Sequence, residues 1–296
     1  MSDTPLAALP ESAPSAAAQR RRQRAYIARQ LLGNPGFIIG AAVILFWCFI
    51  AVAWPLVVPY GPFDTGIGIP LTGPGPEHWM GTDDLGRDVF SRVLAGASDV
   101  LSIAPLATVI TIGLGTLVGL CAAYFGGWID NLLMRSVDIL LVFPPIIIAL
   151  MIISAIGASQ LTMIVIIGLF GAPAVSRTIR AAALRQANKD YISAALMRRE
   201  NNAYILLREV LPNISGPVAV ETTIRFGYAI FAAASLSFLG VSLQPPAADW
   251  GLTITVQRIY LQVQPWSALG PALALASLVI SVNLIADRLR KVLATP

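Results

Sequence analysis

Six long stretches of this chain are almost free of charged residues. They are Gly36–Val58, Leu101–Tyr124, Ile139–Ile156, Leu161–Val175, Ile214–Leu236 and Ala268–Ala286. A helix of about 20 apolar residues spans the hydrocarbon core of a bilayer, and a backbone in lipid must satisfy its own hydrogen bonds. The chain is 56% hydrophobic and only 12% charged, whereas a soluble domain carries about 25% charged residues. These runs predict an all-α integral membrane protein with six transmembrane helices.

The start of the chain differs from the runs. Residues 1–30 are rich in Ala, Pro and Ser and then basic, without apolar periodicity, so we expect a largely disordered tail. The first apolar run is too long for the core of a cleavable signal peptide, and no small-residue cleavage site follows it. Residues 31–290 are therefore expected to form one transmembrane domain. Within it, the short segment 157–159 predicts a tight hairpin between the third and fourth helices.

Basic residues are distributed unevenly around the runs. Segments 1–35, 125–138, 177–213 and 287–296 hold 16 of the 20 Lys and Arg residues. The segments on the opposite side hold three, Arg87, Arg92 and Arg258, and Arg225 lies inside a run. Because loops rich in Lys and Arg stay in the cytoplasm, both termini and segment 177–213 are expected there.

The segment at about residues 60–100, on the predicted outer side, is expected to end in an amphipathic helix. A stretch rich in Pro and Gly leads into HWMGTDDLGRDVFSRVLAGAS, where Asp83 or Asp84 is placed to cap the helix. Asp88 and Arg92 are spaced as an i,i+4 ion pair on its polar face. We expect this helix to lie at the outer surface and to lead into the second span.

A second outer segment, at about residues 238–266, carries two adjacent prolines that forbid a continuous helix. Its aromatic residues are typical of a membrane interface; they are Trp250, Tyr260 and Trp266.

Residues 190–213, DYISAALMRRENNAYILLREVLPN, form a conspicuous polar stretch between apolar runs. Asp190 is placed to cap a short helix that ends near Arg198. Asn201 or Asn202 can start a second helix, which Pro212 is expected to end. A short helix with two small residues and a tyrosine on one face suits docking in a groove of a partner protein. A solvated loop that only reconnects two spans is the alternative.

Several motifs together resemble one family. Residues 190–213 resemble the EAA loop of ABC-importer permeases. HWMGTDDLGRDVFSRVLAGA, AAYFGGWIDNLLMRSVDILLVFPP and SLSFLGVSLQPPAADWG resemble the second, C-type permease subunit of dipeptide, oligopeptide and nickel importers. The resemblance covers about residues 30–292. It implies the ABC type I importer permease fold, with a cytoplasmic coupling helix, in a bacterial inner membrane.

The resemblance also implies partners and roles. A permease of this kind works with a second homologous permease subunit, two ATP-binding subunits and an extracytoplasmic solute-binding protein. It is not an enzyme, because ATP and Mg²⁺ bind to the partner subunits. Its coupling helix inserts into a cleft of an ATP-binding subunit. The residues implied at this contact are Tyr191, Ala194, Ala195, Met197 and Arg198.

Three positions depart from the family's loop signature. Ser193 stands where Glu is usual, Arg199 where Gly is usual, and Glu209 where His or a basic residue is common. A residue other than Gly is costly in the left-handed conformation that commonly ends a helix. The first helix is therefore expected to run on to Asn201 or Asn202, since Asn tolerates that conformation.

The chain shows no catalytic, cofactor-binding or metal-binding pattern. His78 is the one histidine, and both cysteines lie in apolar runs. The net charge of +4 is weak evidence for nucleic acid, which we do not expect as a partner. Glu221 and Arg225 are an opposite-charge pair at helical spacing inside a run, where charges tend to face a cavity or a partner. They are candidates for lining a translocation path near its inner half, and a structural ion pair is the alternative.

ATP-driven import of di- or oligopeptides is the function that the resemblance implies. Import of nickel, metal complexes or another small solute is an alternative within the family. From the residues alone, a stand-alone secondary transporter and a membrane scaffold without a path remain open. Ion coupling usually needs buried titratable groups, and Glu221 is the one carboxylate deep in a predicted span.

Overall fold

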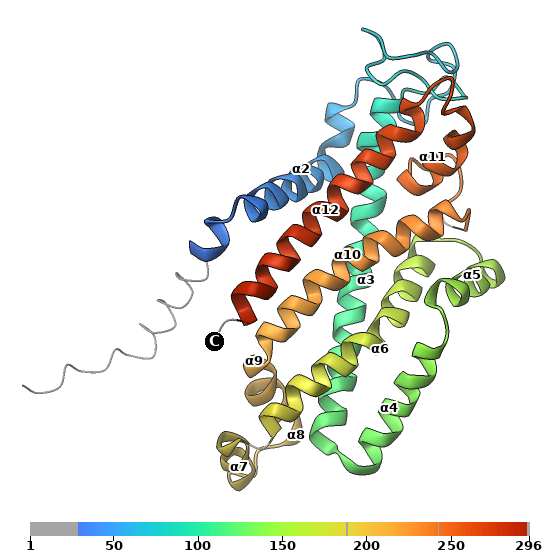
Figure 1. Cartoon of the computed structure of the whole chain (residues 1–296). Coiled ribbons are helices and arrows are strands. Elements are labelled where there is room, and N and C mark those ends of the chain that lie inside the picture. Colours follow the sequence, from blue (N-terminus) through green and yellow to red (C-terminus); the bar gives the residue numbers. More distant parts are fainter. Residues whose placement is uncertain (1–28, 188, 242, 295–296) are drawn as a thin grey trace, which may run out of the picture.

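The protein forms an elongated helical bundle (Figure 1). In this computed structural model, residues 29–187, 189–241 and 243–294 are described. The predicted tail, residues 1–30, therefore lies outside them except for its last two residues. One end of the bundle carries residues 59–88 and 243–265, which we name the cap. The opposite end carries residues 190–213, which we name the elbow.

Four described helices are long and apolar enough to cross a membrane. They are α2 (Pro35–Val57), α3 (Val89–Phe125), α6 (Gln160–Ala187) and α12 (Trp266–Ala294). They confirm the first, second, fourth and sixth predicted spans, although α3 and α6 continue well beyond the predicted bounds. The extra length carries α3 from the cap to the far end of the bundle and α6 to the elbow (Figure 1).

The third predicted span is wrong as a single straight helix. Residues Gly127–Val142 form α4 and Pro145–Ile156 form α5, with a bend of 82° between them. Pro144 and Pro145 explain the break, because a proline inside a helix removes a hydrogen bond and clashes with the preceding turn. The predicted hairpin is confirmed: Gly157 adopts φ 93° and α6 starts three residues later.

The fifth predicted span corresponds to α10 (Ser215–Phe238), which packs against α3, α12 and α6. Over its most apolar stretch, α10 is less apolar than α2, α3, α6 and α12 because it contains Glu221 and Arg225. Among the described residues, the bundle thus holds four clear spans, five if α4 and α5 are one bent span. α10 lies beside them as a further helix.

Close contact between α3 and α6 depends on glycine. A Cβ atom added at Gly115 would lie 2.5 Å from Cβ of Val175, and one at Gly119 would lie 2.6 Å from the carbonyl oxygen of Ser176. Small residues let membrane helices approach closely. Gly113, on the same helix, has nothing within 4 Å of the equivalent position.

Gly115→Leu is therefore expected to destabilise the bundle by about 1–3 kcal/mol or more, the cost of overpacking a well-filled core. Thermal unfolding of the detergent-purified protein, followed by intrinsic fluorescence, measures the change. Gly113→Leu is the matched control and should unfold at the wild-type temperature. Equal stability of the two variants would contradict the packing role of Gly115.

The start of α3 lies in the cap, and it differs from the prediction. Asp88, rather than Asp83 or Asp84, is the N-cap, since its carboxylate accepts from the backbone N–H of Ser91 at 2.7 Å. Asp88 also contacts Nδ1 of His78 at 2.9 Å. The predicted pair between Asp88 and Arg92 does not form; instead Nε of Arg87 donates to Asp83 at 2.6 Å.

The predicted polar face of this helix does not face water. Arg87 is 7% exposed and Arg92 is 4% exposed. Arg92 donates to the carbonyl oxygens of Pro62 and Ala247, one in each half of the cap. The charged residues thus hold the cap together from inside, because buried charges must be paired and hydrogen-bonded.

The second half of the cap contains α11 (Trp250–Gln257) and the short helix η2 (Arg258–Tyr260). Trp250 is fully buried, donates from Nε1 to the carbonyl oxygen of Val93 at 2.8 Å, and packs edge-on against Trp47. The interfacial placement predicted for Trp250 is therefore wrong. Trp266, the first residue of α12, is 40% exposed.

Candidate functional site

The first helix of the elbow is α7 (Asp190–Met197). Its N-cap is Lys189, without a side-chain cap, so the predicted capping role of Asp190 is wrong by one position. Asp190 lies in the first turn, where a carboxylate interacts favourably with the helix dipole.

α7 does not run on to Asn201 or Asn202. Arg199 itself adopts the left-handed conformation with φ 57°, and the backbone N–H of Glu200 donates to the carbonyl oxygen of Ala195 at 3.2 Å. This bond closes the helix in the manner usually built on glycine. The position thus keeps the geometry that suits glycine although it carries arginine.

Arg199→Gly is expected to stabilise the end of α7 by about 1–2 kcal/mol, the cost that a side chain brings to the left-handed conformation. Hydrogen exchange at the amide of Glu200 should slow by a corresponding factor. Arg198→Gly is the control, because Arg198 has φ −73° and gains nothing from glycine. If hydrogen exchange at Glu200 is unchanged in Arg199→Gly, the left-handed conformation of Arg199 does not destabilise the end of α7.

The second helix of the elbow starts where the sequence predicts. Asn201 caps it by accepting from the backbone N–H of Tyr204 at 2.7 Å. The helix is α in α8 (Asn202–Tyr204), π in η1 (Ile205–Val210) and α again in α9 (Leu211–Asn213).

Pro212 does not end this helix, contrary to the prediction. Leu211, the residue before it, is helical (φ −57°, ψ −44°), and its backbone N–H donates to the carbonyl oxygen of Leu206, five residues earlier. The wider π turn lies directly before the proline, where an ordinary α turn would bring the ring against the preceding carbonyl groups. The chain then leaves the helix at Ile214 and enters α10.

One face of the elbow packs onto the ends of α3 and α6. Its buried members are Ile192, Ala195, Ile205 and Val210, which share a core cluster with Leu120, Val175, Ile179 and Ile214 among others. Two hydrogen bonds add to this contact: Tyr124 on α3 donates to Asn202 at 3.0 Å, and Tyr191 donates to Gln186 on α6 at 3.1 Å. The elbow is therefore firmly attached to two membrane helices.

The residues predicted for coupling do not share one surface. Ala195 is fully buried, Tyr191 and Ala194 are half-buried, and Met197 and Arg198 are exposed. Burial, with a contribution from Glu209, raises the pKa of the Tyr191 phenol. The side of α7 that carries Tyr191 and Ala195 therefore packs mostly against the rest of the chain.

The free face of α7 includes Met197 from the predicted set and adds Leu196 and Ser193. Met197 is 80% exposed, Leu196 is 53% exposed, and Ser193 is exposed one turn before Leu196. Leu196 escaped the sequence analysis, although its spacing from Ser193 places both on one side of the helix. Arg198 pairs with Glu200 at 3.4 Å and with Glu209 at 3.3 Å. The departure at Glu209 therefore has a local partner.

The two charged residues of α10 form the predicted pair. Nε of Arg225 donates to Glu221 at 3.0 Å, and the Arg225 guanidinium lies 5.4 Å from the centre of the Tyr228 ring. Glu221 is the seventh and Arg225 the eleventh of the 24 residues of α10, so both lie in the half of the helix next to the elbow, Arg225 close to its middle.

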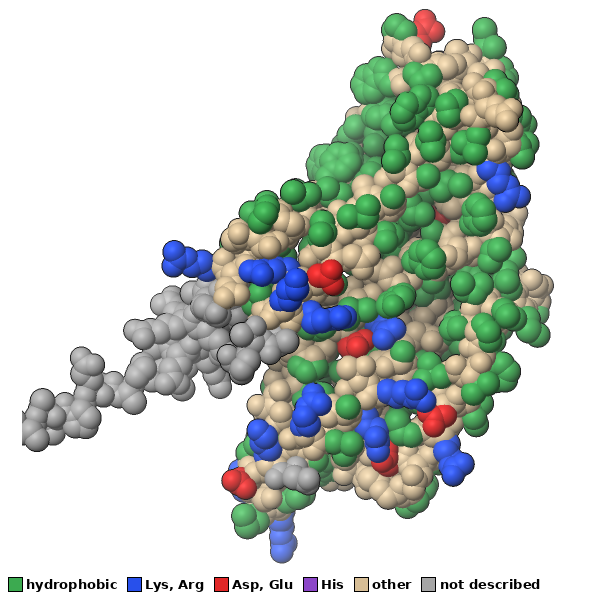
Figure 2. All heavy atoms as spheres, in the orientation of Figure 1, with side chains coloured by type: hydrophobic (Ala, Val, Ile, Leu, Met, Phe, Trp, Pro, Cys, Tyr) green, Lys and Arg blue, Asp and Glu red, His purple; other side chains and the backbone are tan. Residues whose placement is uncertain are grey.

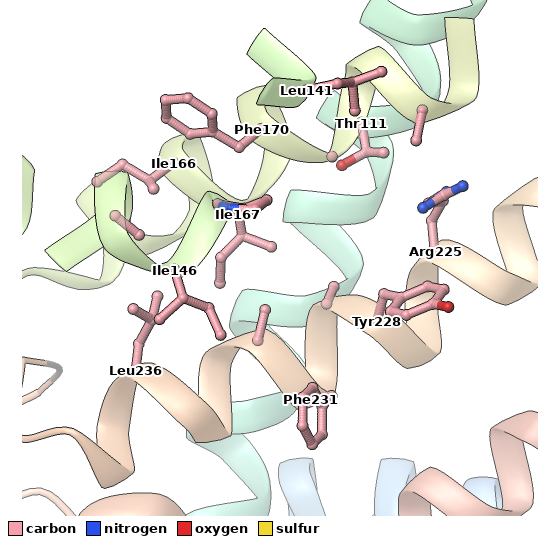
Figure 3. A pocket seen from close by; sticks show the side chains of 16 residues that line it. Thr111, Leu141, Ile146, Ile166, Ile167, Phe170, Arg225, Tyr228, Phe231 and Leu236 are labelled. Carbon is pink, nitrogen blue, oxygen red and sulfur yellow. The ribbon is translucent and has the colours of Figure 1, made fainter. Parts of the chain in front are cut away.

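Arg225 also reaches a cavity of about 470 Å³ between α5, α6 and α10 (Figure 3). Glu221 is not among the residues that line it. Apart from Arg225 the lining is almost entirely apolar; it includes Ile146, Ile166, Phe170, Phe231 and Leu236. No three His, Cys, Asp or Glu side chains group as metal ligands in the part of the chain that the structure describes.

Comparison with known proteins identifies the family to which this chain belongs. The family described as binding-protein-dependent transport system inner membrane component matches residues 115–295. The dipeptide transport system permease protein DppC of Alkalihalophilus pseudofirmus is 36% identical over 265 residues, which cover 90% of this chain and 87% of that protein. This chain belongs to the same family of ABC-importer permeases.

Two further relatives of the permease are similar over most of their length. A putative peptide transport system permease protein of Brucella abortus is 37% identical and covers 90% of each chain. The glutathione transport system permease protein GsiD of Pectobacterium atrosepticum is 36% identical over 75% of this chain and 73% of that protein. The permease is thus a non-catalytic membrane subunit of a transporter complex and carries no cofactor of its own.

The fold has a solved counterpart. A chain from the MetNI methionine ABC transporter, crystallised in inward-facing conformations, has a TM-score of 0.55 and 18% sequence identity; the match covers 68% of this chain and 96% of that chain. This likeness supports the ABC-importer permease fold. Family membership also favours an importer subunit over a stand-alone transporter or a scaffold.

Proposed function

We propose that the permease forms half of the translocation path of an ATP-driven importer for di- or oligopeptides. The observation that carries this proposal is the set of relatives above, which are named for dipeptide, peptide and glutathione transport and align with most of the permease. Glutathione is itself a small peptide. A second homologous permease would form the other half, and an extracytoplasmic binding protein would deliver the solute.

The proposed energy source is a pair of ATP-binding subunits that hold ATP and Mg²⁺. Their contact would be α7, because its free face offers Leu196 and Met197 as apolar anchors while its opposite face is attached to α3 and α6. Ala195 would act by positioning α7 rather than by touching the partner. ATP binding would shift the spans only if it favours one of their arrangements over the other.

The proposed orientation places the elbow and both termini in the cytoplasm of a bacterial cell. Lys and Arg side chains gather over the half of the molecule that carries the elbow and the end of α12, away from the cap (Figure 2). This distribution is the one that the positive-inside rule associates with cytoplasmic loops. The cap would then lie outside the cell membrane, beneath the binding protein.

Uptake by a reconstituted complex tests the proposal. Vesicles that contain the permease, its second permease subunit and both ATP-binding subunits receive the binding protein on one side and ATP on the other. Labelled alanyl-leucine should accumulate with ATP and not with a non-hydrolysable analogue. ATP-independent accumulation by the permease alone, or accumulation of nickel without any peptide, would refute it.

A further inference from the structure

The cavity between α5, α6 and α10 has the size of a ligand site. Its volume of about 470 Å³ lies within the range of about 300–1,000 Å³ that small-molecule sites occupy. Apolar side chains form most of its wall, and Arg225 is the one charged residue among the described residues that line it. Figure 3 shows Arg225 at one end of the cavity, with Ile146, Ile166 and Leu236 toward the other end.

Arg225 has donors to spare. Its hydrogen bond to Glu221 uses Nε, and neither Nη atom makes a hydrogen bond with another described residue. A guanidinium carries five N–H donors in a planar fork. The Arg225 side chain is 19% exposed, so its outer N–H groups can donate to water or to a ligand that enters the cavity.

The combination of wall and fork selects the chemistry of the ligand. A hydrocarbon would fill the cavity but not use the fork, and an inorganic anion would use the fork but not the wall. A carboxylate binds the two outer nitrogens of an arginine in a bidentate manner, and an apolar group attached next to it would enter the cavity. The C-terminal residue of a peptide, with an apolar side chain, has this composition.

We propose that the cavity binds the C-terminal residue of the transported peptide, with its carboxylate on Nη1 and Nη2 of Arg225 and its side chain among Ile146, Ile166 and Leu236. This inference rests on the proposed peptide transport and goes beyond it by naming the end of the peptide that the permease reads. In this proposal the two charged residues have different roles: Glu221 orients the Arg225 side chain, and Arg225 binds the carboxylate of the peptide.

Photolabelling of the complete vesicle-embedded complex tests the contact. The probe is alanyl-photoleucine, whose diazirine side chain inserts into whatever it touches when illuminated. Labels mapped by mass spectrometry should lie on cavity residues, and Arg225→Gln should reduce them roughly tenfold, the value of one charge-assisted hydrogen bond. A probe with a C-terminal amide in place of the carboxylate should label the wild-type cavity roughly tenfold less than the carboxylate probe does. Arg225→Gln should lower the labelling by this amide probe little further.

A cavity-filling variant tests the wall without touching the arginine. Ala232 lines the cavity, so Ala232→Phe should lower uptake of alanyl-leucine relative to alanyl-glycine roughly tenfold, by removing space for the larger side chain. Ile147→Phe is the matched control, because Ile147 is 54% exposed on α5 and is not part of the cavity lining. The binding protein is the same in every experiment, so its preference between the two peptides does not change. A change in the ratio of the two uptakes between variants therefore reports on the permease.

The outcomes separate the two proposals. If the wild-type vesicles accumulate no peptide with ATP, the proposed function fails. If they accumulate peptide while labels lie outside the cavity, or labelling is unchanged in Arg225→Gln, only the cavity proposal fails. An uptake ratio that Ala232→Phe leaves at the wild-type value also overturns the cavity proposal.

Discussion

ATP-driven uptake is expected to fall by a factor of at least about ten in a complex that carries Met197→Asp. Met197 is 80% exposed, so the substitution should change the stability of the permease itself by no more than about 0.5 kcal/mol. If α7 docks in a groove of an ATP-binding subunit, the new carboxylate must leave water without a partner, which costs several kcal/mol. Uptake by vesicles and retention of the ATP-binding subunits on an affinity-tagged permease measure the effect.

Leu207→Asp is the matched control for this experiment. Leu207 is 60% exposed and also lies in the elbow, but on η1 rather than on α7. It should leave uptake and subunit retention near the wild-type values. Normal uptake in Met197→Asp, or equal losses in the two variants, would contradict docking through the end of α7.

Asp83→Asn is expected to destabilise the cap by about 3–5 kcal/mol, the usual cost of removing one partner of a buried ion pair. Asp83 is 1% exposed and accepts from Nε of Arg87 at 2.6 Å, and Nε of Arg92 lies 3.7 Å from the same carboxylate. The amide keeps the shape but removes the negative charge, so both guanidinium groups lose compensation in a buried site. Hydrogen exchange and limited proteolysis within residues 59–88 should show the cap opening.

Asp64→Asn provides the comparison within the same cap. Asp64 is exposed, and substitutions of exposed residues usually change stability by less than about 0.5 kcal/mol. Its proteolysis pattern should match the wild type. Protection of residues 59–88 that survives Asp83→Asn would show that the cap does not depend on this charge.

The membrane helices could be predicted because their signal is local. Five of the six apolar runs each form one helix close to the predicted position, and the third is broken after Val142 by two adjacent prolines. The polarity of residues 190–213 likewise predicted two short helices. Helix formation in lipid is dictated by the backbone, so tertiary contacts had little room to overrule it.

Burial of charge could not be predicted in the same way. The sequence predicts Arg92 on the polar face of a helix because charged residues usually lie in solvent. In the structure Arg92 is buried and donates to Ala247 in the second half of the cap, 155 residues further along the chain. The burial of Ala195 could not be predicted either. A small residue marks close approach, but here the approaching surface belongs to the same chain.

The cavity itself left almost no trace in the sequence. Its wall comes from five helices, α3, α4, α5, α6 and α10, and consists mainly of residue types that would look the same if they faced lipid. Arg225 was the one visible sign, because a charge inside a predicted span requires an explanation. The sequence located the residue, and the arrangement of the helices shows what surrounds it.

The helices on either side of the elbow in sequence, α6 and α10, also supply most of the cavity wall. Ten residues of continuous helix separate Arg225 from the start of α10, a lever arm of about 15 Å at 1.5 Å per residue. A tilt of 10° at that end would carry the guanidinium through about 2.6 Å, enough to part it from a bound carboxylate. A movement of the elbow with the ATP-binding subunits would then also move Arg225. The ATP cycle could in this way weaken binding of the peptide without any direct contact between the ATP-binding subunits and the cavity.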